Sequence, residues 1–211
     1  MARILVINVN WLGDVIFSSP IFRALRQQDP AAHIACMAVP RVREILECIP
    51  EIDEIIPYDE AGQDKGVGAK LRWIRQLKKG RFDTAYFLSR SMSRAILIRL
   101  AGIPERIGYE NKGRGRLLTR IVPEPVQPVH RSDYYLNVVE SAGVVVQDRK
   151  TYLHPPPDVE AEVRERLTEW GLKTGEPKIV FNPGGNWDLK RWPKASFARL
   201  IDYVAQRTNA R

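Results

Sequence analysis

Runs of branched apolar residues alternate with amphipathic segments through the first half of the chain. The apolar runs are typical of buried parallel strands, and they cover residues 3–9, 33–39, 52–57 and 82–88. The amphipathic segments predict helices from residue 14 to about 28, and over residues 42–48, 67–79 and 92–101. Pro20 is expected near the start of the first helix, or as a kink within it. This alternation predicts an α/β fold with a Rossmann-like, doubly wound parallel sheet.

Two loops of the predicted sheet carry polar residues. Asn10–Asp14 follows the first strand, and Ser89–Ser93 follows the strand that ends at Leu88. In doubly wound sheets, the ligand crevice lies beyond the carboxyl ends of the strands. We therefore expect the two loops to converge on one crevice.

A proline-rich stretch marks the predicted domain boundary. His154–Pro157 is stiff and cannot be helical, and it follows an extended connection over residues 123–128 and a helix over residues 133–142. The first domain is therefore predicted to cover residues 1–154.

Residues 155–211 are predicted to begin a second α/β domain. The pattern indicates, in order, a helix, a strand and a helix over residues 159–170, 178–181 and 196–206. One strand and two helices do not complete such a domain. We therefore expect the polypeptide to be a fragment or a truncated product.

The chain is basic, with a formal net charge of +8, and 44% of its residues are apolar. Such a surface favours anionic partners: nucleic acid, acidic lipid headgroups or phosphorylated sugars. Residues 65–81 hold seven basic residues and no acidic one. Residues 90–120 hold eight basic residues against Glu105 and Glu110. Solvated helix faces are the alternative interpretation of both runs.

Targeting and metal-binding signals are absent from the sequence. Its beginning does not resemble a signal peptide, and no stretch approaches the roughly 20 apolar residues that cross a bilayer. Cys36 and Cys48 lack metal-ligand spacing, and the three histidines lie far apart. We expect a cytoplasmic protein with reduced thiols and no metal site.

Asp14 is the first candidate for chemistry. Gly13 is expected to let the backbone turn sharply and a ligand approach closely. A carboxylate at the start of the next helix suits a general base, which removes a proton from an attacking sugar hydroxyl. A helix N-cap is the alternative, and the two roles are compatible.

The segment Phe181–Pro193 is the second candidate. Backbone N–H groups in its glycine turn (Gly184, Gly185, Asn186), together with Lys190 and Arg191, suit a diphosphate. The alternative is a plain strand–helix loop with surface cations.

A basic loop and a serine-rich loop complete the candidates. In Asn111–Arg116, glycines between cations suggest a mobile segment that wraps an anion, with Arg114 and Arg116 as contacts. A flexible surface loop and a nucleic-acid contact are the alternatives, although no nucleic-acid-binding motif accompanies the loop. Ser91 is a candidate acceptor contact or a plain loop residue. No Gly-x-Gly-x-x-Gly follows the first strand, which argues against a dinucleotide oxidoreductase.

Several ordered motifs together resemble glycosyltransferase family 9, the heptosyltransferases, and most of all its heptosyltransferase II type. The resemblance runs from residue 3 to about 205. It is carried by Ile4–Ile7 with Asn10–Asp14, Arg81–Tyr86, Leu100–Pro104 with Arg106–Gly108, and Asn182–Gly185 with Lys190–Pro193.

The resemblance implies a GT-B architecture of two Rossmann-like domains, the first holding the acceptor and the second the nucleotide sugar. It implies an inverting, metal-independent transferase without a cofactor. This enzyme would move heptose from ADP-L-glycero-D-manno-heptose to the lipopolysaccharide inner core. By position, Asp14 matches the proposed base, Gly13 a loop that closes on the donor, and Lys190 the cation on the donor phosphates. Gly184, Gly185 and Asn186 fall in the same donor loop, beside Arg191.

The implied partners are the nucleotide-sugar donor, the lipopolysaccharide core and, peripherally, the cytoplasmic face of the inner membrane. Nucleic acid is not among them. Because the second domain is expected to be incomplete, the alternative is a non-catalytic module that binds an anionic glycolipid or a nucleotide sugar.

Overall fold

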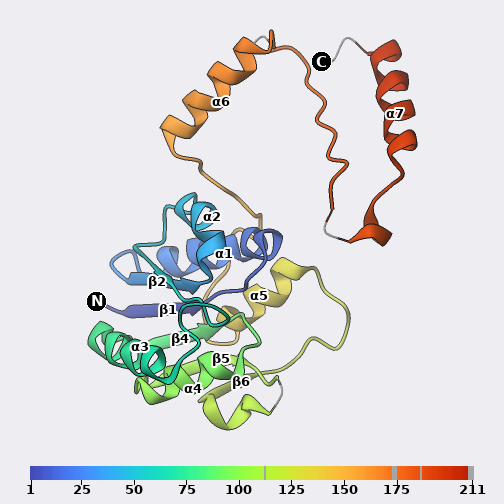
Figure 1. The fold of residues 1–211 in the computed structure, drawn as a ribbon. Helices are drawn as coiled ribbons and strands as arrows, with labels where there is room; N and C mark the ends of the chain where they lie inside the picture. The colour runs from blue at the N-terminus through green and yellow to red at the C-terminus, as the bar shows by residue number, and fades with distance from the viewer. Residues whose placement is uncertain (112, 173–174, 186, 209–211) are drawn as a thin grey trace. The chain divides into compact units, whose positions relative to one another are not determined.

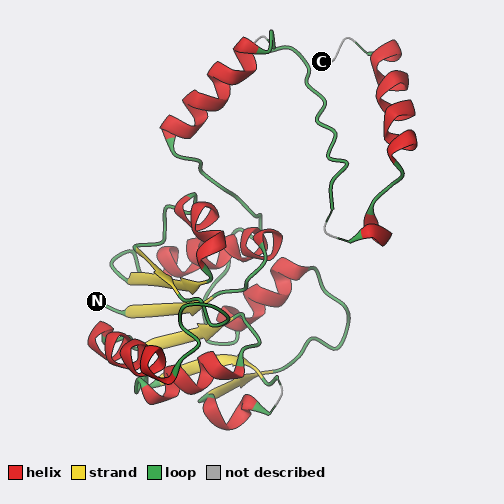
Figure 2. Cartoon of the chain, viewed as in Figure 1, coloured by secondary structure: helices red, strands yellow, loops and turns green. Residues whose placement is uncertain are grey.

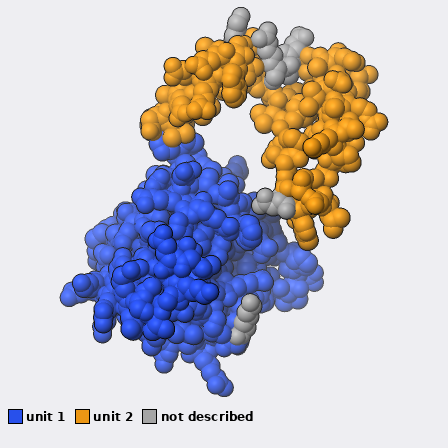
Figure 3. Space-filling view, in the orientation of Figure 1, with its two compact units in different colours: residues 1–156 blue, residues 157–211 orange. Residues whose placement is uncertain are grey.

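The computed structural model describes residues 1–111, 113–172, 175–185 and 187–208. The chain divides into two compact units, Met1–Pro156 and Pro157–Arg211, which are coloured separately in Figure 3. These are called the first and second units below. The division falls two residues after the boundary that the sequence predicts.

Six parallel strands form the sheet of the first unit, in the order β3-β2-β1-β4-β5-β6 (Figures 1 and 2). In chain order they are β1 (Arg3–Ile7), β2 (His33–Ala38), β3 (Glu54–Pro57), β4 (Thr84–Phe87), β5 (Glu105–Tyr109) and β6 (Arg120–Val122). The chain winds outward from β1 to one edge, returns beside β1, and winds to the other edge. This is the doubly wound order of a Rossmann fold, so the predicted fold class is confirmed.

Helices cover both faces of this sheet (Figure 2). One layer holds α1 (Leu12–Gln28), α2 (Arg43–Glu47) and α5 (Arg131–Glu140), and the other holds α3 (Val67–Gly80) and α4 (Met92–Leu100). Short 3-10 turns occupy Pro40–Val42 (η1) and Arg114–Leu117 (η2). Side chains of β1 alternate between the layers: Val6 packs in the first core and Leu5 in the second. The sheet is therefore buried on both faces, which explains the unbroken apolar runs.

Pro20 lies within α1 rather than near its start. A proline in the middle of a helix lacks the N–H that would bond to the carbonyl four residues earlier. The residue is on the buried side of the helix.

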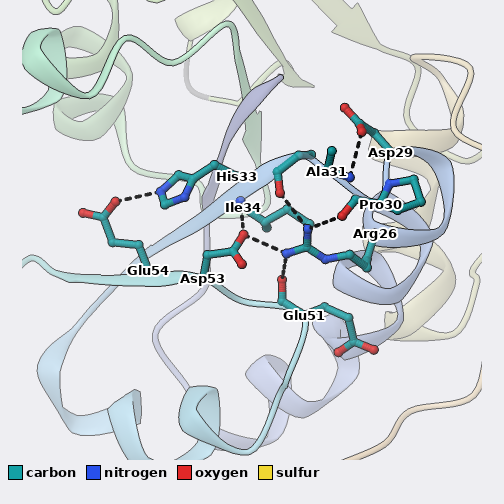
Figure 4. Close-up of polar contacts among 10 residues, drawn as sticks. Arg26, Asp29, Pro30, Ala31, His33, Ile34, Glu51, Asp53 and Glu54 are labelled. Carbon is teal, nitrogen blue, oxygen red and sulfur yellow. Dashed lines mark hydrogen bonds and ion pairs between the residues drawn. The ribbon is translucent and has the colours of Figure 1, made fainter. Parts of the chain in front are cut away.

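A polar network fastens the end of the sheet opposite the crevice (Figure 4). The Arg26 guanidinium, at the end of α1, donates to the Glu51 carbonyl at 2.9 Å and to the Asp53 carboxylate at 2.7 Å. Asp53 also accepts from the Ile34 backbone N–H at 2.7 Å. Partial burial raises the pKa of Asp53, but the Ile34 N–H and Arg26 outweigh it and leave the pKa below its usual value. The network ties α1, β2 and the segment before β3 together.

The sequence pattern missed β5 and β6. Arg106 and Gly108 interrupt the apolar run of β5, although the Arg106 guanidinium turns back to the Leu117 carbonyl at 2.7 Å. A Cβ at residue 108 would lie only 2.8 Å from Phe87 Cβ on β4. Glycine is therefore required there by contact between neighbouring strands, which local sequence does not reveal.

The second unit contains α6 (Pro157–Glu169), the 3-10 turn η3 (Asp188–Lys190) and α7 (Lys194–Arg207). The strand predicted over residues 178–181 is wrong, because the structure assigns no strand to these residues. A strand needs a neighbour to satisfy its backbone hydrogen bonds. No described residue after Pro156 is buried.

None of the helices among the described residues has both the length and the apolar character that a membrane span requires.

Candidate functional site

A crevice of about 620 Å³ opens beyond the carboxyl ends of β1 and β4. These strands are neighbours, with Ile7 opposite Phe87, and the winding direction reverses between them. Ligands of doubly wound sheets bind at this point. The walls come from four segments: Val9, Asn10, Trp11 and Asp14; Glu60; Leu88–Ser93; and Arg131, Tyr134 and Tyr135. The two loops that the sequence singled out therefore do meet in one crevice.

Asp14 lies in the first turn of α1 and faces this crevice, with 28% of its side chain exposed. Its Oδ1 accepts a hydrogen bond from the Tyr135 hydroxyl at 3.1 Å and lies 3.5 Å from Arg131 Nε. The N-cap of α1 is Trp11, without a side-chain cap. The capping alternative for Asp14 is therefore wrong, and its contacts reach across to α5 instead.

Helix α5 brings Arg131, Tyr134 and Tyr135 to one face of the crevice. Residues three and four apart share a helix face, and the Arg131 guanidinium lies 5.9 Å and 6.0 Å from the two tyrosine ring centres. Burial, and next the Asp14 carboxylate, raise the pKa of the Tyr135 hydroxyl. Tyr135 therefore stays protonated at neutral pH and acts as a hydrogen-bond donor to Asp14.

Arg94 lies beneath the crevice and is fully buried. Its Nη1 donates to the Asn8 carbonyl and its Nη2 to Asn10 Oδ1, each at 3.0 Å. Its Nε lies 3.4 Å from the Glu60 carboxylate. Burial lowers the pKa of Arg94, and Glu60 opposes that effect. The guanidinium joins α4, the loop after β1 and the loop after β3, so it holds the Asn10–Asp14 segment in place.

Ser91 lines the crevice and begins α4. Its hydroxyl accepts from the Arg94 backbone N–H at 3.1 Å and lies within hydrogen-bonding distance of both Glu60 carboxylate oxygens, at 2.9 and 3.0 Å. Ser91 is thus both a helix cap and a polar group at the crevice wall.

Trp11 forms an apolar lip on the crevice, with 60% of the residue exposed. The Arg41 guanidinium stacks on it, 4.5 Å from a ring centre, and donates to the Asn10 carbonyl at 2.7 Å from Nη2. A flat apolar ring beside a cation suits the face of a sugar or a similar ring.

The conformation of Gly13 differs from the prediction. Gly13 lies inside the first turn of α1, its φ is not left-handed, and a Cβ there would meet nothing within 4 Å. The prediction of a sharp backbone turn that requires glycine at residue 13 is therefore wrong.

Arg114 is 1% exposed, and its guanidinium donates to the Tyr109 and Ser89 carbonyls. Such a side chain supports the backbone and does not present a cation to a ligand. The prediction of an anion contact at Arg114 is therefore wrong. Arg116 is exposed in the same turn, but it is not among the crevice-lining residues.

The candidate donor loop lies in the second unit. Gly184, Gly185 and Arg191 line a hollow of about 780 Å³ beside Trp192 and α7. Arg191 forms an ion pair with Asp188. The Gly184 N–H donates to Asn182 Oδ1 at 3.2 Å, which stabilises the turn.

Lys190 lies on η3, with its Nζ 5.3 Å from a ring centre of Trp187, and is not among the residues lining that hollow. Asn186 lies outside the described residues.

Sequence reasoning found two of the four segments that line the crevice and missed Glu60 and the residues of α5. The spacing of Arg131, Tyr134 and Tyr135 was a usable signal, because it places one cation and two rings on one helix face. Arg94 and Glu60 gave no signal, since their pairing depends on contact between distant segments. Among the described residues, no cluster of three histidine, cysteine, aspartate or glutamate residues is placed to hold a metal ion.

Comparison with known proteins gives a consistent result. The family model "Glycosyltransferase family 9 (heptosyltransferase)" matches residues 70–210. Lipopolysaccharide heptosyltransferase 2 of Escherichia coli K12 is 31% identical over 205 residues, which are 94% of this chain and 59% of that protein. The protein of the same name from Salmonella typhimurium is 30% identical over the same shares of each chain.

Two solved structures share the fold. A family 9 glycosyl transferase from Veillonella parvula has a TM-score of 0.85 at 27% identity, covering 97% of this chain and 60% of its own. E. coli ADP-heptose lps heptosyltransferase II has a TM-score of 0.76 at 27% identity, covering 97% and 61%. The chain thus spans about three fifths of the length of the proteins it matches.

Proposed function

This chain belongs to glycosyltransferase family 9, and from that premise we propose that it serves in transferring heptose from ADP-L-glycero-D-manno-heptose to the lipopolysaccharide inner core. The observation that carries the proposal is the partly exposed carboxylate of Asp14, in the crevice where the winding of the sheet reverses. Two relatives carry the name lipopolysaccharide heptosyltransferase 2. Because these relatives are transferases, the alternative of a non-catalytic binding module is not favoured.

Asp14 is the proposed general base. It removes the proton from an acceptor hydroxyl as the oxygen attacks the anomeric carbon of the donor. A bond forms between that oxygen and the anomeric carbon, while the bond from this carbon to the diphosphate oxygen breaks. ADP leaves with the electron pair on the opposite side, so a single displacement inverts the configuration.

Tyr135 and Arg131 orient this base. Both reach the same carboxylate oxygen, Oδ1 of Asp14, at 3.1 and 3.5 Å. The other oxygen, Oδ2, is therefore the one proposed to take the proton.

Negative charge on the departing diphosphate is proposed to be stabilised without a metal ion. The groups that would do so are Lys190 and the backbone N–H of Gly185, in the turn that the Gly184–Asn182 hydrogen bond stabilises. Loss of one such preorganised contact costs about 3 kcal/mol, or about a hundredfold in rate.

The first unit is proposed to hold the acceptor and the second to hold the nucleotide sugar. Ser91, Arg131 and the Trp11 ring are the groups of the crevice suited to a phosphorylated sugar chain. We propose that the protein works in the cytoplasm, in peripheral contact with the inner face of the cytoplasmic membrane, where a lipid-linked acceptor is reached.

The test of this proposal is a transfer assay with purified protein, ADP-heptose and a heptose-deficient core acceptor, with product measured by mass spectrometry. Asp14→Asn is expected to reduce turnover at least about a hundredfold, the lower range for losing a general base. Asp29→Asn, at the far end of α1, is the matched control and should retain wild-type turnover. Full turnover by Asp14→Asn would end the assignment of the base.

Acceptor binding by the 211-residue chain provides a test that is independent of turnover. Calorimetry with phosphorylated core oligosaccharide is expected to show binding that Arg131→Gln weakens. Equal affinity of the two proteins would remove Arg131 from the acceptor site.

A further inference from the structure

Helix α3 has one face on the sheet and one exposed face. Trp73 and Leu77 are buried in the second core. The outward side presents Arg75 and Lys79, one turn apart, beside Leu71, which is 49% exposed. The exposed side of the helix thus combines cations with apolar side chains.

Helix α4 packs beside α3 on the same face of the sheet (Figure 1) and continues this surface. Its outward side presents Ile96, Arg99 and Leu100, and the two apolar residues are 45% and 61% exposed. We define the α3–α4 surface by these outward residues: Val67, Leu71, Arg75, Lys78, Lys79, Ile96, Arg99 and Leu100.

The cations of this surface are not neutralised by the protein. Among the described residues, Arg75, Lys78, Lys79 and Arg99 form no ion pair with a carboxylate. The acidic groups nearest in sequence are Asp83, which accepts from the Arg3 backbone N–H at 2.8 Å, and Glu105, which accepts from the Thr84 hydroxyl at 3.3 Å. On the other side of α3, Asp64 pairs with Arg72 at 2.8 Å. The surface therefore carries an uncompensated positive field.

From this combination we propose that the α3–α4 surface docks on an anionic lipid bilayer. The inference deepens the peripheral membrane contact proposed above and rests on that proposal. Anionic headgroups complement the cations, and the exposed apolar side chains among them can enter the boundary between headgroups and acyl chains. Nucleic acid would match the charge but would leave Val67, Leu71, Ile96 and Leu100 without a favourable contact.

The position of the surface fits the crevice. Both α3 and α4 follow strands of the sheet, so their first turns lie on the same side as the carboxyl ends of β3 and β4. Ser91, which caps α4, is itself a wall of the crevice. Lys78, Lys79, Arg99 and Leu100 lie in the last turns of the two helices, toward the opposite end of the sheet. A bilayer along the length of both helices would therefore reach the edge of the sheet at which the crevice opens.

The test is co-sedimentation of the full 211-residue chain with lipid vesicles. Vesicles that contain phosphatidylglycerol are expected to bind the chain, pure phosphatidylcholine vesicles are not, and binding should weaken as salt rises. Each cation near an anionic surface adds about fivefold to binding. The double variant Arg75→Gln/Lys79→Gln is therefore expected to bind about 25-fold more weakly.

A matched control removes two exposed cations elsewhere in the first unit. Arg43→Gln/Lys150→Gln has the same net charge as the first variant and should bind within about twofold of the wild type. A third variant, Leu71→Asn, keeps every charge and is also expected to weaken vesicle binding, because it removes apolar surface. Unchanged far-UV circular dichroism and thermal melting would show that the variants fold.

Three results would overturn the proposal. They are equal losses in the two double variants, equal binding to the two kinds of vesicle, and tighter binding to duplex DNA or RNA than to anionic vesicles at the same salt. The vesicles contain no sugar donor or acceptor. Failure here and loss of the transferase proposal are therefore separate outcomes.

Discussion

Replacement of the buried Arg94 with methionine is expected to destabilise the first unit by about 3 kcal/mol, because breaking a buried ion pair by removing one partner costs about 3–5 kcal/mol. Methionine retains the unbranched, flexible shape of the aliphatic part of the side chain. The change therefore removes the guanidinium and leaves most of the packing.

The magnitude follows from the groups left behind. The Asn8 carbonyl and Asn10 Oδ1 each lose a donor at 3.0 Å, and Glu60 loses the cation 3.4 Å away. The Glu60 side chain remains 31% exposed, so water replaces part of what it loses. The lower end of the range for buried pairs, about 3 kcal/mol, is therefore the expected cost.

Urea unfolding and thermal melting measure this cost. A loss of 3 kcal/mol in a unit of this size corresponds to a fall in Tm of about 6–12 °C. Arg43→Met is the matched control, because Arg43 forms an exposed i,i+4 pair with Glu47 at 2.7 Å. Such pairs contribute about 0.3–0.5 kcal/mol.

A double-mutant cycle isolates the pair itself. If Arg94 and Glu60 are coupled as their geometry indicates, adding Glu60→Gln to Arg94→Met should cost less than Glu60→Gln alone. Interacting pairs of this kind show coupling energies of about 0.5–3 kcal/mol. An Arg94→Met protein as stable as the Arg43→Met control would refute the view that Arg94 holds the loops of the crevice.

Three further predictions concern stability and reactivity. The pKa of Asp53 is lowered in the folded state. Its stabilising contribution is therefore present above the unfolded pKa, about 3.9, and is lost as pH falls through the folded pKa. Urea titrations should show that Asp53→Asn loses less stability than the wild type between pH 5 and pH 3. Gly108→Ala would place a Cβ 2.8 Å from the neighbouring strand and should destabilise the fold by about 1–3 kcal/mol. Gly68→Ala, with open space around it in α3, should stabilise the fold by up to about 1 kcal/mol. Similar unfolding midpoints for the two variants would contradict this account. Burial raises the pKa of the Cys36 thiol to about 12, so Ellman's reagent at pH 8 should modify only Cys48 in the native chain and both thiols in denaturant, and fast native modification of a Cys48→Ser protein would show that Cys36 is accessible.

The outcome for Asp14 shows what local sequence can and cannot provide. Its place after the first strand predicted a crevice-facing carboxylate, because the carboxyl ends of parallel strands share one edge of the sheet. Its partners, Tyr135 and Arg131, lie more than a hundred residues away. Nothing in the segment around residue 14 indicates them, and the capping role that local sequence favoured is replaced by these distant contacts.

For Arg114, local sequence led to a wrong prediction. Cations between glycines predicted an exposed anion contact, yet the side chain is buried against the Tyr109 and Ser89 carbonyls. Sequence gives the charge of a side chain but not the direction in which it points. That direction depends on which backbone carbonyls the fold leaves unsatisfied nearby.

The sequence by itself determined the fold class, the order of most elements and the loops that form the crevice, because the burial pattern of parallel strands and helices is written in local periodicity. Tertiary structure alone decided strands β5 and β6, the buried Arg94, the Asp14–Tyr135 contact and the absence of a strand at residues 178–181. Each of these depends on a neighbour that is distant in sequence or on whether a pairing strand is present, and the energy of such contacts is not encoded in any single segment.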